Sequence, residues 1–280
     1  MTALHIHNEA SRRHDGLTAQ LTAIGEEVLP LVETVTGLPL PDPVVIRLVS
    51  LRAWRRLSRR RERRLYHSEI RDLPAVTRDD IRAAVLTRRT ERRARKQTWF
   101  LTGGQIIDVT PGQAELVIMP AALRESGWLT DQRSLHRILA HEATHLAQYR
   151  ASDPQTWQHM RTLFPRARGI EHLAHRSLIE GHAYWADGQI TQRLLGPEEN
   201  TGITPPSRAS LRYRAVAESP EYAAARSFLN NGQQCVTSVI DAIGTDRFNQ
   251  VWADDTLIPT RAEITNPATW KERFHRPDPT

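Results

Sequence analysis

The stretch that decides how this chain is understood is RILAHEATHLAQYR, from Arg137 to Arg150. His141 and His145 are four residues apart, and Glu142 directly follows the first histidine. Small and apolar residues surround all three, so the segment is predicted to be a helix. On a helix, side chains four residues apart lie on one face, about one turn from each other. The two imidazoles can therefore point at the same ion.

These residue types are suited to zinc. Zinc in proteins binds ring nitrogens, and a catalytic zinc site keeps one position open for water. Glu142 lies about 100° around the helix from His141, where it can reach that water without being a ligand. This is the H-E-x-x-H arrangement, in which the glutamate is the general base. Three fixed positions also occur by chance, but the strongly helical segment and the strands expected before it favour a metal site.

Two histidines do not complete a metal site, and the third ligand is usually a later histidine or glutamate. After His145 the sequence LAQYRAS lacks the continuation that is typical of metzincins. Glu180, within LIEGHAYWAD, is the best candidate, because a loop and a second helix could return it antiparallel to the first helix. A carboxylate among apolar neighbours also needs a partner. The competing candidates, with the middle one as second choice, are His172, His175 and His182.

Groups that support the ligands are also predicted. Histidines bound to a metal usually donate their other N–H to a carboxylate or a carbonyl. Asp187 lies two turns beyond the proposed glutamate ligand and is predicted to orient His141 or His145. Tyr184 faces the same way and is a candidate catalytic residue that would donate a hydrogen bond to an oxyanion. Ordinary packing is the other interpretation of this tyrosine and of two alternatives to it, Tyr213 and Tyr222.

The composition is that of a soluble globular protein. The chain has 280 residues, 39% of them hydrophobic and 25% charged, which is enough for one large domain or two small ones. No apolar run approaches the roughly 18 residues of a membrane span, and the polar start MTALHIHNEASRRHDG has no apolar signal segment. The single cysteine, Cys235, has no partner for an internal disulfide. We therefore expect a cytoplasmic protein with no membrane partner.

The net charge of +6 is concentrated in two arginine-rich stretches. These are RAWRRLSRRRERRLYHSEIR at 52–71 and TRRTERRARK at 87–96. Basic runs can bind phosphate backbones or acidic partners. No aromatic residues are interleaved in a nucleic-acid pattern and no recognition motif is present. A solvated helical face, with no specific nucleic-acid partner, is the favoured interpretation.

The order of predicted elements indicates a mostly helical α+β protein with a small antiparallel or mixed sheet beside the 130–150 helix. An all-helical C-terminal subdomain is expected to follow, with an Arg-rich N-terminal part at 1–98 and a catalytic part at 99–280. The patterns predict helices at 14–37, 51–70, 77–96, 130–150 and 173–195, strands at 44–50, 97–110 and 114–123, a loop at 201–207, and three short helices with a tail after Pro220. Thr77 and Asp80 form a capping-box start, and the last two strands are expected to pair antiparallel around TPGQ.

The pair HEATHLAQ and EGHA resembles the zincins that use a glutamate ligand. More narrowly, it resembles a bacterial family of zincin-type metallohydrolases common in actinobacteria, some labelled as associated with deazaflavin coenzyme biosynthesis. The segment 226–274 is similar to that family's closing region, where a glycine-containing helix precedes hN-x-V-W and LPT-x-x-E-I-x-x-P-x-x-W. The resemblance covers about 141–274. It implies a zincin fold, Zn²⁺ bound by His141, His145 and Glu180, and Glu142 as the base.

The sequence therefore predicts a zinc-dependent hydrolase of peptide or amide bonds. Glu142 would take a proton from water and pass it to the leaving amine. The strand AELVIMP is expected either to pair with an extended substrate or to be a core strand. A peptidase in the cytoplasm must be restrained, by a selective cleft or by N-terminal helices that cover it. The alternatives are a zinc amidase with a narrow pocket for a small biosynthetic intermediate, and a non-catalytic zincin-fold binding module, against which Glu142 argues.

Overall fold

The computed structural model describes residues 2–110, 112–152, 154–197 and 207–274. The loop predicted at 201–207 lies outside these residues except for its last position, and the predicted tail lies outside them after 274. Within the described ranges, no helix combines the length and the apolar character needed to span a membrane.

The sheet is mixed, as the sequence predicts. Its strands are β1 (Leu4–Asn8), β2 (Val44–Leu48), β3 (Gly104–Thr110) and β4 (Gln113–Ile118), in the order β1-β2-β4-β3. β1, β2 and β4 are parallel, and β3 pairs antiparallel with β4 as predicted. β1 was not predicted, because its histidines make LHIHN look polar. The predicted strand at 114–123 is too long, since Pro120 begins helix α4 (Pro120–Ser126).

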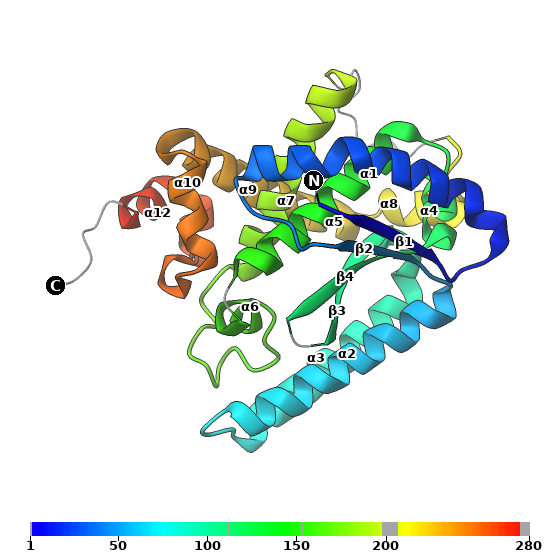
Figure 1. The fold of residues 1–280 in the computed structure, drawn as a ribbon. Coiled ribbons are helices and arrows are strands. Elements are labelled where there is room, and N and C mark those ends of the chain that lie inside the picture. Colours follow the sequence, from blue (N-terminus) through cyan, green and yellow to red (C-terminus); the bar gives the residue numbers. More distant parts are fainter. Residues whose placement is uncertain (1, 111, 153, 198–206, 275–280) are drawn as a thin grey trace.

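Side chains along a strand alternate between the two faces of the sheet. Here each face packs against helices. Ile106, Leu116 and Ile118 face the main core, which also contains residues of α1 (Asp15–Thr36) and α5 (Gln132–Ala151). Ile107 and Val117 face the opposite way and pack with Trp54 of α2 (Leu51–Asp72). Figure 1 shows α1 and α2 on opposite sides of the sheet. The sheet therefore separates the large core from a smaller core that lies between the sheet and α2.

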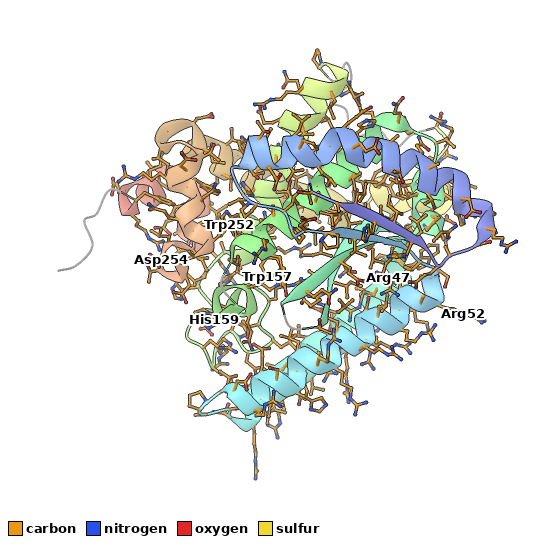
Figure 2. All side chains as sticks on the ribbon, in the orientation of Figure 1. Arg47, Arg52, Trp157, His159, Trp252 and Asp254 are labelled. Atoms are coloured by element: carbon orange, nitrogen blue, oxygen red, sulfur yellow. The ribbon has the colours of Figure 1, made fainter. Side chains whose placement is uncertain are left out.

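The arginine-rich segments form a hairpin of two helices, α2 and α3 (Arg78–Thr98), and α3 begins at the predicted Thr77 capping box. Buried Glu62 accepts hydrogen bonds from Arg88 at 3.0 Å and from Arg95, which ties the helices together. Other arginines are exposed along α2: Arg52 (Figure 2), Arg56, Arg59, Arg60 and Arg63. The basic stretches thus have an ion-paired inner face and a solvated outer face.

Helix α7 (His175–Leu195) packs against both α5 and α9 (Pro220–Ile243). α7 and α9 meet at Gly181 and Gly232. A Cβ atom on Gly181 would lie 2.5 Å from the backbone carbonyl of Gly232, and one on Gly232 would lie 2.7 Å from the carbonyl oxygen of Ser177. Only glycine permits this approach, which fixes the position of the residue before Gly181, the predicted ligand Glu180.

The C-terminal part is all-helical, as predicted, but its helices differ from the prediction. In place of three short helices after Pro220, α9 is one helix of 24 residues, followed by the short helices α10 (Thr245–Phe248), α11 (Arg261–Thr265) and α12 (Pro267–Arg273). Gly232 does not break α9 because the helix packs tightly against α7 there. The division into 1–98 and 99–280 stays a prediction; strands from both parts share one sheet and one core.

Candidate metal centre

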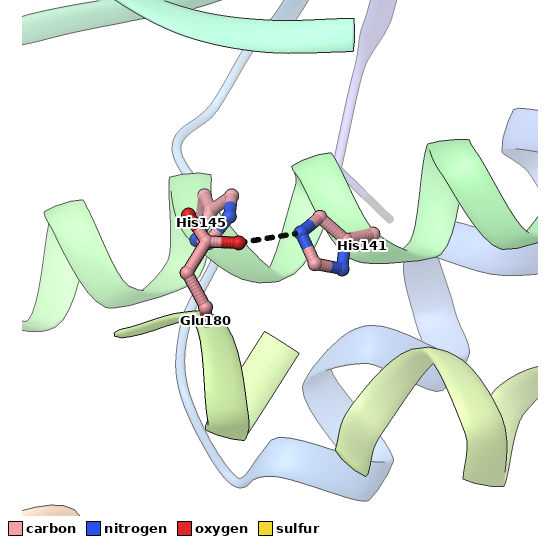
Figure 3. A group of neighbouring side chains, drawn as sticks. All are labelled: His141, His145 and Glu180. Atoms are coloured by element: carbon pink, nitrogen blue, oxygen red, sulfur yellow. Dashed lines mark ion pairs between the residues drawn. The ribbon is translucent and has the colours of Figure 1, made fainter. Parts of the chain in front are cut away.

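Helix α5 carries the three motif residues on its buried side. Asp131 caps its start by accepting a hydrogen bond from the backbone N–H of Ser134 at 2.8 Å. Glu142 and His145 are buried, and His141 is mostly buried. The i and i+4 positions of the histidines put both rings on the side that faces α7 (Figure 3).

His141, His145 and Glu180 converge in space. Each residue offers one ligand atom, and these atoms lie within 4.8 Å of one another. His141 Nε2 is 3.5 Å from Glu180 Oε2, across the gap between α5 and α7 (Figure 3). Ligands at the usual 2.0–2.1 Å from a tetrahedral zinc ion are roughly 3.3 Å apart. The two ring nitrogens and the carboxylate are therefore a donor set that fits zinc.

The remaining nitrogens of both rings are held by hydrogen bonds. His141 Nδ1 donates to Asp187 Oδ2 at 2.9 Å, and Asp187 Oδ1 accepts from Arg137 Nε at 3.1 Å. His145 Nδ1 donates to Gln148 Oε1 at 2.8 Å. These bonds fix each ring and leave Nε2 directed at the cluster. The sequence offered His141 and His145 as possible partners of Asp187, and in the structure Asp187 bonds to His141.

Sequence reasoning missed Gln148. This amide is fully buried, and its Nε2 donates to the carbonyl of Ile179 at 3.0 Å and lies 3.1 Å from His182 Nδ1. Gln148 thereby connects the second histidine of the motif to α7. A polar amide one turn after His145 on the apolar face of a helix was the signal that could have identified it.

The three histidines that competed with Glu180 lie outside the cluster. Among the described residues, only His141, His145 and Glu180 group closely enough to hold a metal ion. His182 is fully buried and packs against the rings of Trp185, Phe248 and Trp252. The exposed His172 and the partly buried His175 also lie apart from the group. The second-choice ligand therefore has no place in the observed geometry.

Charges within the cluster shift the pKa values of its members. Burial opposes a charge on His141, but the hydrogen bonds to Asp187 and Glu180 outweigh it and raise the pKa of His141 well above its usual value. Burial and the neighbouring His141 lower the pKa of His145 to about 4. Burial would raise the pKa of Glu180, but its partner His141 and other cations lower that pKa to about 2. Metal binding at this site must therefore release a proton from His141.

Glu142 stands beside the cluster and is not part of it. Burial raises the pKa of Glu142 to about 7, with a further small increase from Glu180 and an opposing effect of His141. Its side chain lies against Gly104 of β3, where an added Cβ atom would be 2.6 Å from Glu142 Cγ. The absence of a side chain at this glycine leaves the room that the carboxylate occupies. A carboxylate that titrates near neutral pH is suited to general-base chemistry.

We expect Gly104→Ala to impair turnover by displacing Glu142. The new methyl group would overlap the middle of the glutamate side chain, so the carboxylate must move to another rotamer. A shift of about 1 Å in a catalytic group can cost roughly 10²-fold in rate, and kcat should fall by about that factor.

The control for this prediction is Gly103→Ala. The atoms nearest to an added Cβ there are the methyl ends of Ile138 and Leu123, each at 3.2 Å, and a ring carbon of Trp128 at 3.6 Å, whereas at Gly104 the nearest atom belongs to Glu142. Steady-state kinetics at equal zinc content should show a small effect for Gly103→Ala. Equal losses in the two variants would show that Gly104 has no special relation to the base.

Tyr184 packs on the ring of His141, with ring centroids 4.6 Å apart. It also lines the cleft that opens over the cluster. Burial raises the pKa of its hydroxyl, so Tyr184 stays protonated and able to donate a hydrogen bond at neutral pH. Tyr213 is buried against the rings of Phe100 and Trp128, which is ordinary packing. Tyr184 thus lies beside the first histidine of the cluster, and its role as an oxyanion donor stays a prediction.

A cleft of about 1360 Å³ opens over the cluster. Its walls are formed by α2 and α3, the start of β3, α5, α7, α9 and the chain after α6 (Pro154–Met160). Glu69, at the far end of α2, accepts hydrogen bonds from the backbone N–H of Leu163 at 2.7 Å, from Arg168 Nε at 3.2 Å and from Thr162. These bonds hold the α2–α3 hairpin along one side of the cleft. N-terminal helices that cover the cleft are one of the possible restraints on activity that the sequence suggests.

The strand that borders the cleft is β3 and not the predicted AELVIMP strand. β4 lies inside the sheet with β2 and β3 as neighbours, so the core-strand interpretation holds for it. β3 is an edge strand, and Gly104, Gln105 and Ile106 line the cleft. A chain that adds to the sheet would have to pair with β3.

Residues 224–270 match the family model described as zincin-like metallopeptidase. This match supports a place in the zincin superfamily. Members of this family depend on a metal ion, which is usually zinc. The cluster of His141, His145 and Glu180 is compatible with such a metal site. The matched segment covers most of α9 and of the short helices that follow, and it does not include the cluster itself.

A crystal structure from Chloroflexus aurantiacus, described as that of "a putative hydrolase with a novel fold", is similar to this chain. The TM-score is 0.58 at 21% sequence identity, and the alignment covers 92% of this chain and 90% of that chain. At this identity the likeness shows a shared fold. No curated protein matches the chain. The narrower actinobacterial family and its deazaflavin label stay predictions from the sequence.

Proposed function

We propose that the protein is a zinc-dependent hydrolase of peptide bonds. The observation that carries this proposal is the convergence of His141, His145 and Glu180 beside Glu142 on the floor of a large cleft. The match of residues 224–270 to a metallopeptidase family adds support. A binding module would have no use for a buried carboxylate with a pKa near 7.

Each residue then has a distinct task. A zinc ion held by His141, His145 and Glu180 would supply Lewis acidity toward a carbonyl group and would acidify water. Glu142 would accept a proton from the attacking water and pass it to the leaving amine. The hydroxyl of Tyr184 would donate a hydrogen bond to the oxygen that becomes negative during the reaction.

The cleft favours a peptide over a small biosynthetic intermediate. Its volume of about 1360 Å³ exceeds the roughly 300–1,000 Å³ of a typical small-molecule pocket. An extended peptide could add to the edge of β3 at Gly104–Ile106, directly over Glu142. The hairpin of α2 and α3 would limit which peptides enter, which supplies the restraint that an intracellular peptidase needs.

The proposal is tested by incubating the zinc-loaded protein with a peptide library and with a set of small amides. We expect peptide cleavage, detected by mass spectrometry, that stops on chelation and returns with about one equivalent of zinc. Cleavage of small amides alone would favour the amidase. If folded, zinc-loaded protein cleaves neither class, the enzymatic proposal is wrong and the binding module gains support.

A further inference from the structure

Two arginines line the part of the cleft between α6 and α2. Arg161 follows α6, and Arg61 lies on the inner side of α2. Both side chains are partly buried, whereas the arginines on the outer face of α2 are exposed to solvent. Arg161 lines the same cleft as Glu142 and Glu180, and the charges of both carboxylates act on it.

Arg161 carries an unsatisfied donor. Its Nη1 is shielded from solvent and has no hydrogen-bond partner on the protein, and its guanidinium carbon lies 5.4 Å from the centre of the Trp157 ring. A buried donor without a partner costs free energy, and most buried polar groups in native proteins are paired, so an unpaired one calls for an explanation such as a bound group. The stacking on Trp157 holds the guanidinium plane in place but does not satisfy its N–H groups.

Among the described residues, Asp108 is the one carboxylate that forms an ion pair with either arginine. Arg61 Nε is 3.7 Å from Asp108 Oδ2, and burial and the neighbouring Arg161 lower the pKa of Arg61 to about 9. Asp108 also attracts Arg161, so the two cations share this one carboxylate. Glu91 acts on both as well, but it is paired with Arg95 at 3.2 Å. A metal ion bound near Glu180 would add further positive charge to this end of the cleft.

We propose that Arg161 and Arg61 form a receptor for a carboxylate of the substrate, close to the bond that is cut. Guanidinium groups bind carboxylates through paired, charge-assisted hydrogen bonds. A substrate carboxylate would satisfy the free Nη1 of Arg161 and relieve its repulsion with Arg61. The inference deepens the proposed function by naming its substrate class: peptides with a free C-terminal carboxylate or an acidic side chain next to the scissile bond.

Binding is tested first on metal-free protein, so that neither zinc nor turnover is required. The C-terminal probe is N-acetyl-alanyl-alanine, compared with its C-terminal amide. The side-chain probe is N-acetyl-glutamic acid α-amide, compared with N-acetyl-glutamine amide. We expect calorimetry to show that at least one carboxylate probe binds roughly 10²-fold more tightly than its neutral counterpart. The probe that binds identifies the source of the carboxylate.

The variants are Arg161→Gln, Arg161→Lys and Arg61→Gln. Each Gln variant should remove most of the preference for the carboxylate probe, and Arg161→Lys should restore part of it because the charge returns without the paired donors. The matched controls are Arg166→Gln and Arg60→Gln, since these arginines are exposed neighbours of the pair. Both controls should bind the probes as the unaltered protein does. Thermal unfolding verifies that each variant is folded.

The inference is wrong if carboxylate and amide probes bind equally, if neither binds, or if the preference survives both Gln variants. In the enzyme assay, Arg161→Gln should lower kcat/KM for acidic substrates roughly 10²-fold and leave their amide counterparts within a few-fold. Carboxylate binding without any hydrolysis would refute the proposed function and leave the receptor intact. Hydrolysis without a preference for carboxylate substrates would support the proposed function and refute the carboxylate receptor.

Discussion

Glu142→Gln is expected to abolish most turnover and to leave the zinc site and the fold intact. Glutamine has nearly the same shape but cannot accept a proton at neutral pH. General-base steps contribute roughly 10²–10⁴-fold to rate, so kcat should fall by at least about 10²-fold. The loss should appear in kcat more than in KM, because the proton moves in the transition state. The measurement is steady-state kinetics on a cleaved peptide at equal zinc content.

The pKa of Glu142 gives an independent check that the variant is properly folded. In metal-free protein that pKa is about 7, above the usual 4.5, so ionising Glu142 opposes folding as the pH rises through this range. Stability from the protonated form is complete below about pH 4.5 and is lost as the pH passes 7. Glutamine never ionises, so metal-free Glu142→Gln should be more stable than the unaltered protein at pH 8. Near pH 4 the two should be similar.

The matched control is Glu171→Gln, which makes the same chemical change at an exposed position outside the cleft. Its kinetics and its pH profile of stability should be unchanged. Turnover in Glu142→Gln equal to that of the control would rule out the proposed role of the base. Identical behaviour of the two variants in binding assays, with no substrate cleaved by either, would favour the binding module.

The features predicted correctly from the sequence are those that local chemistry determines. The spacing of His141 and His145 places both rings on one helix face whatever surrounds the helix. The Thr77 capping box and the end of α1 at Gly37, which has a φ of 65°, likewise depend on a few neighbouring residues. Convergence with Glu180 required only that a second helix return alongside the first.

The features that the sequence did not reveal depend on distant parts of the chain. β1 is stabilised by pairing with β2, some 40 residues later, and its own residues alternate between polar and apolar in only five positions. Gly104 matters because β3 passes against Glu142, and Gly232 because α9 passes against α7. Gln148 bonds to a carbonyl of α7. None of these contacts has a signature within one segment.

Glu180→Ala is expected to remove most of the bound zinc. The two histidines alone offer a weak site, because zinc sites in catalytic proteins use three protein ligands. If each ligand contributes about a third of a total of roughly 10 kcal/mol, the loss of one weakens binding by at least about 10²-fold. Glu180→Gln should also bind zinc poorly, since it keeps the shape but lacks the negative charge. Elemental analysis after gel filtration measures the zinc content, and competition with a chelator measures the affinity.

The control for this prediction is His175→Ala, because His175 lies on the same helix and was the competing candidate from the sequence. It is not among the residues that converge, so its variant should keep about one equivalent of zinc. Full zinc occupancy in Glu180→Ala together with loss in His175→Ala would show that the third ligand is wrongly assigned. Loss in both would point to unfolding of α7, which circular dichroism would detect. Loss in Glu180→Ala alone, in a folded protein, would establish the carboxylate as the ligand that closes the site.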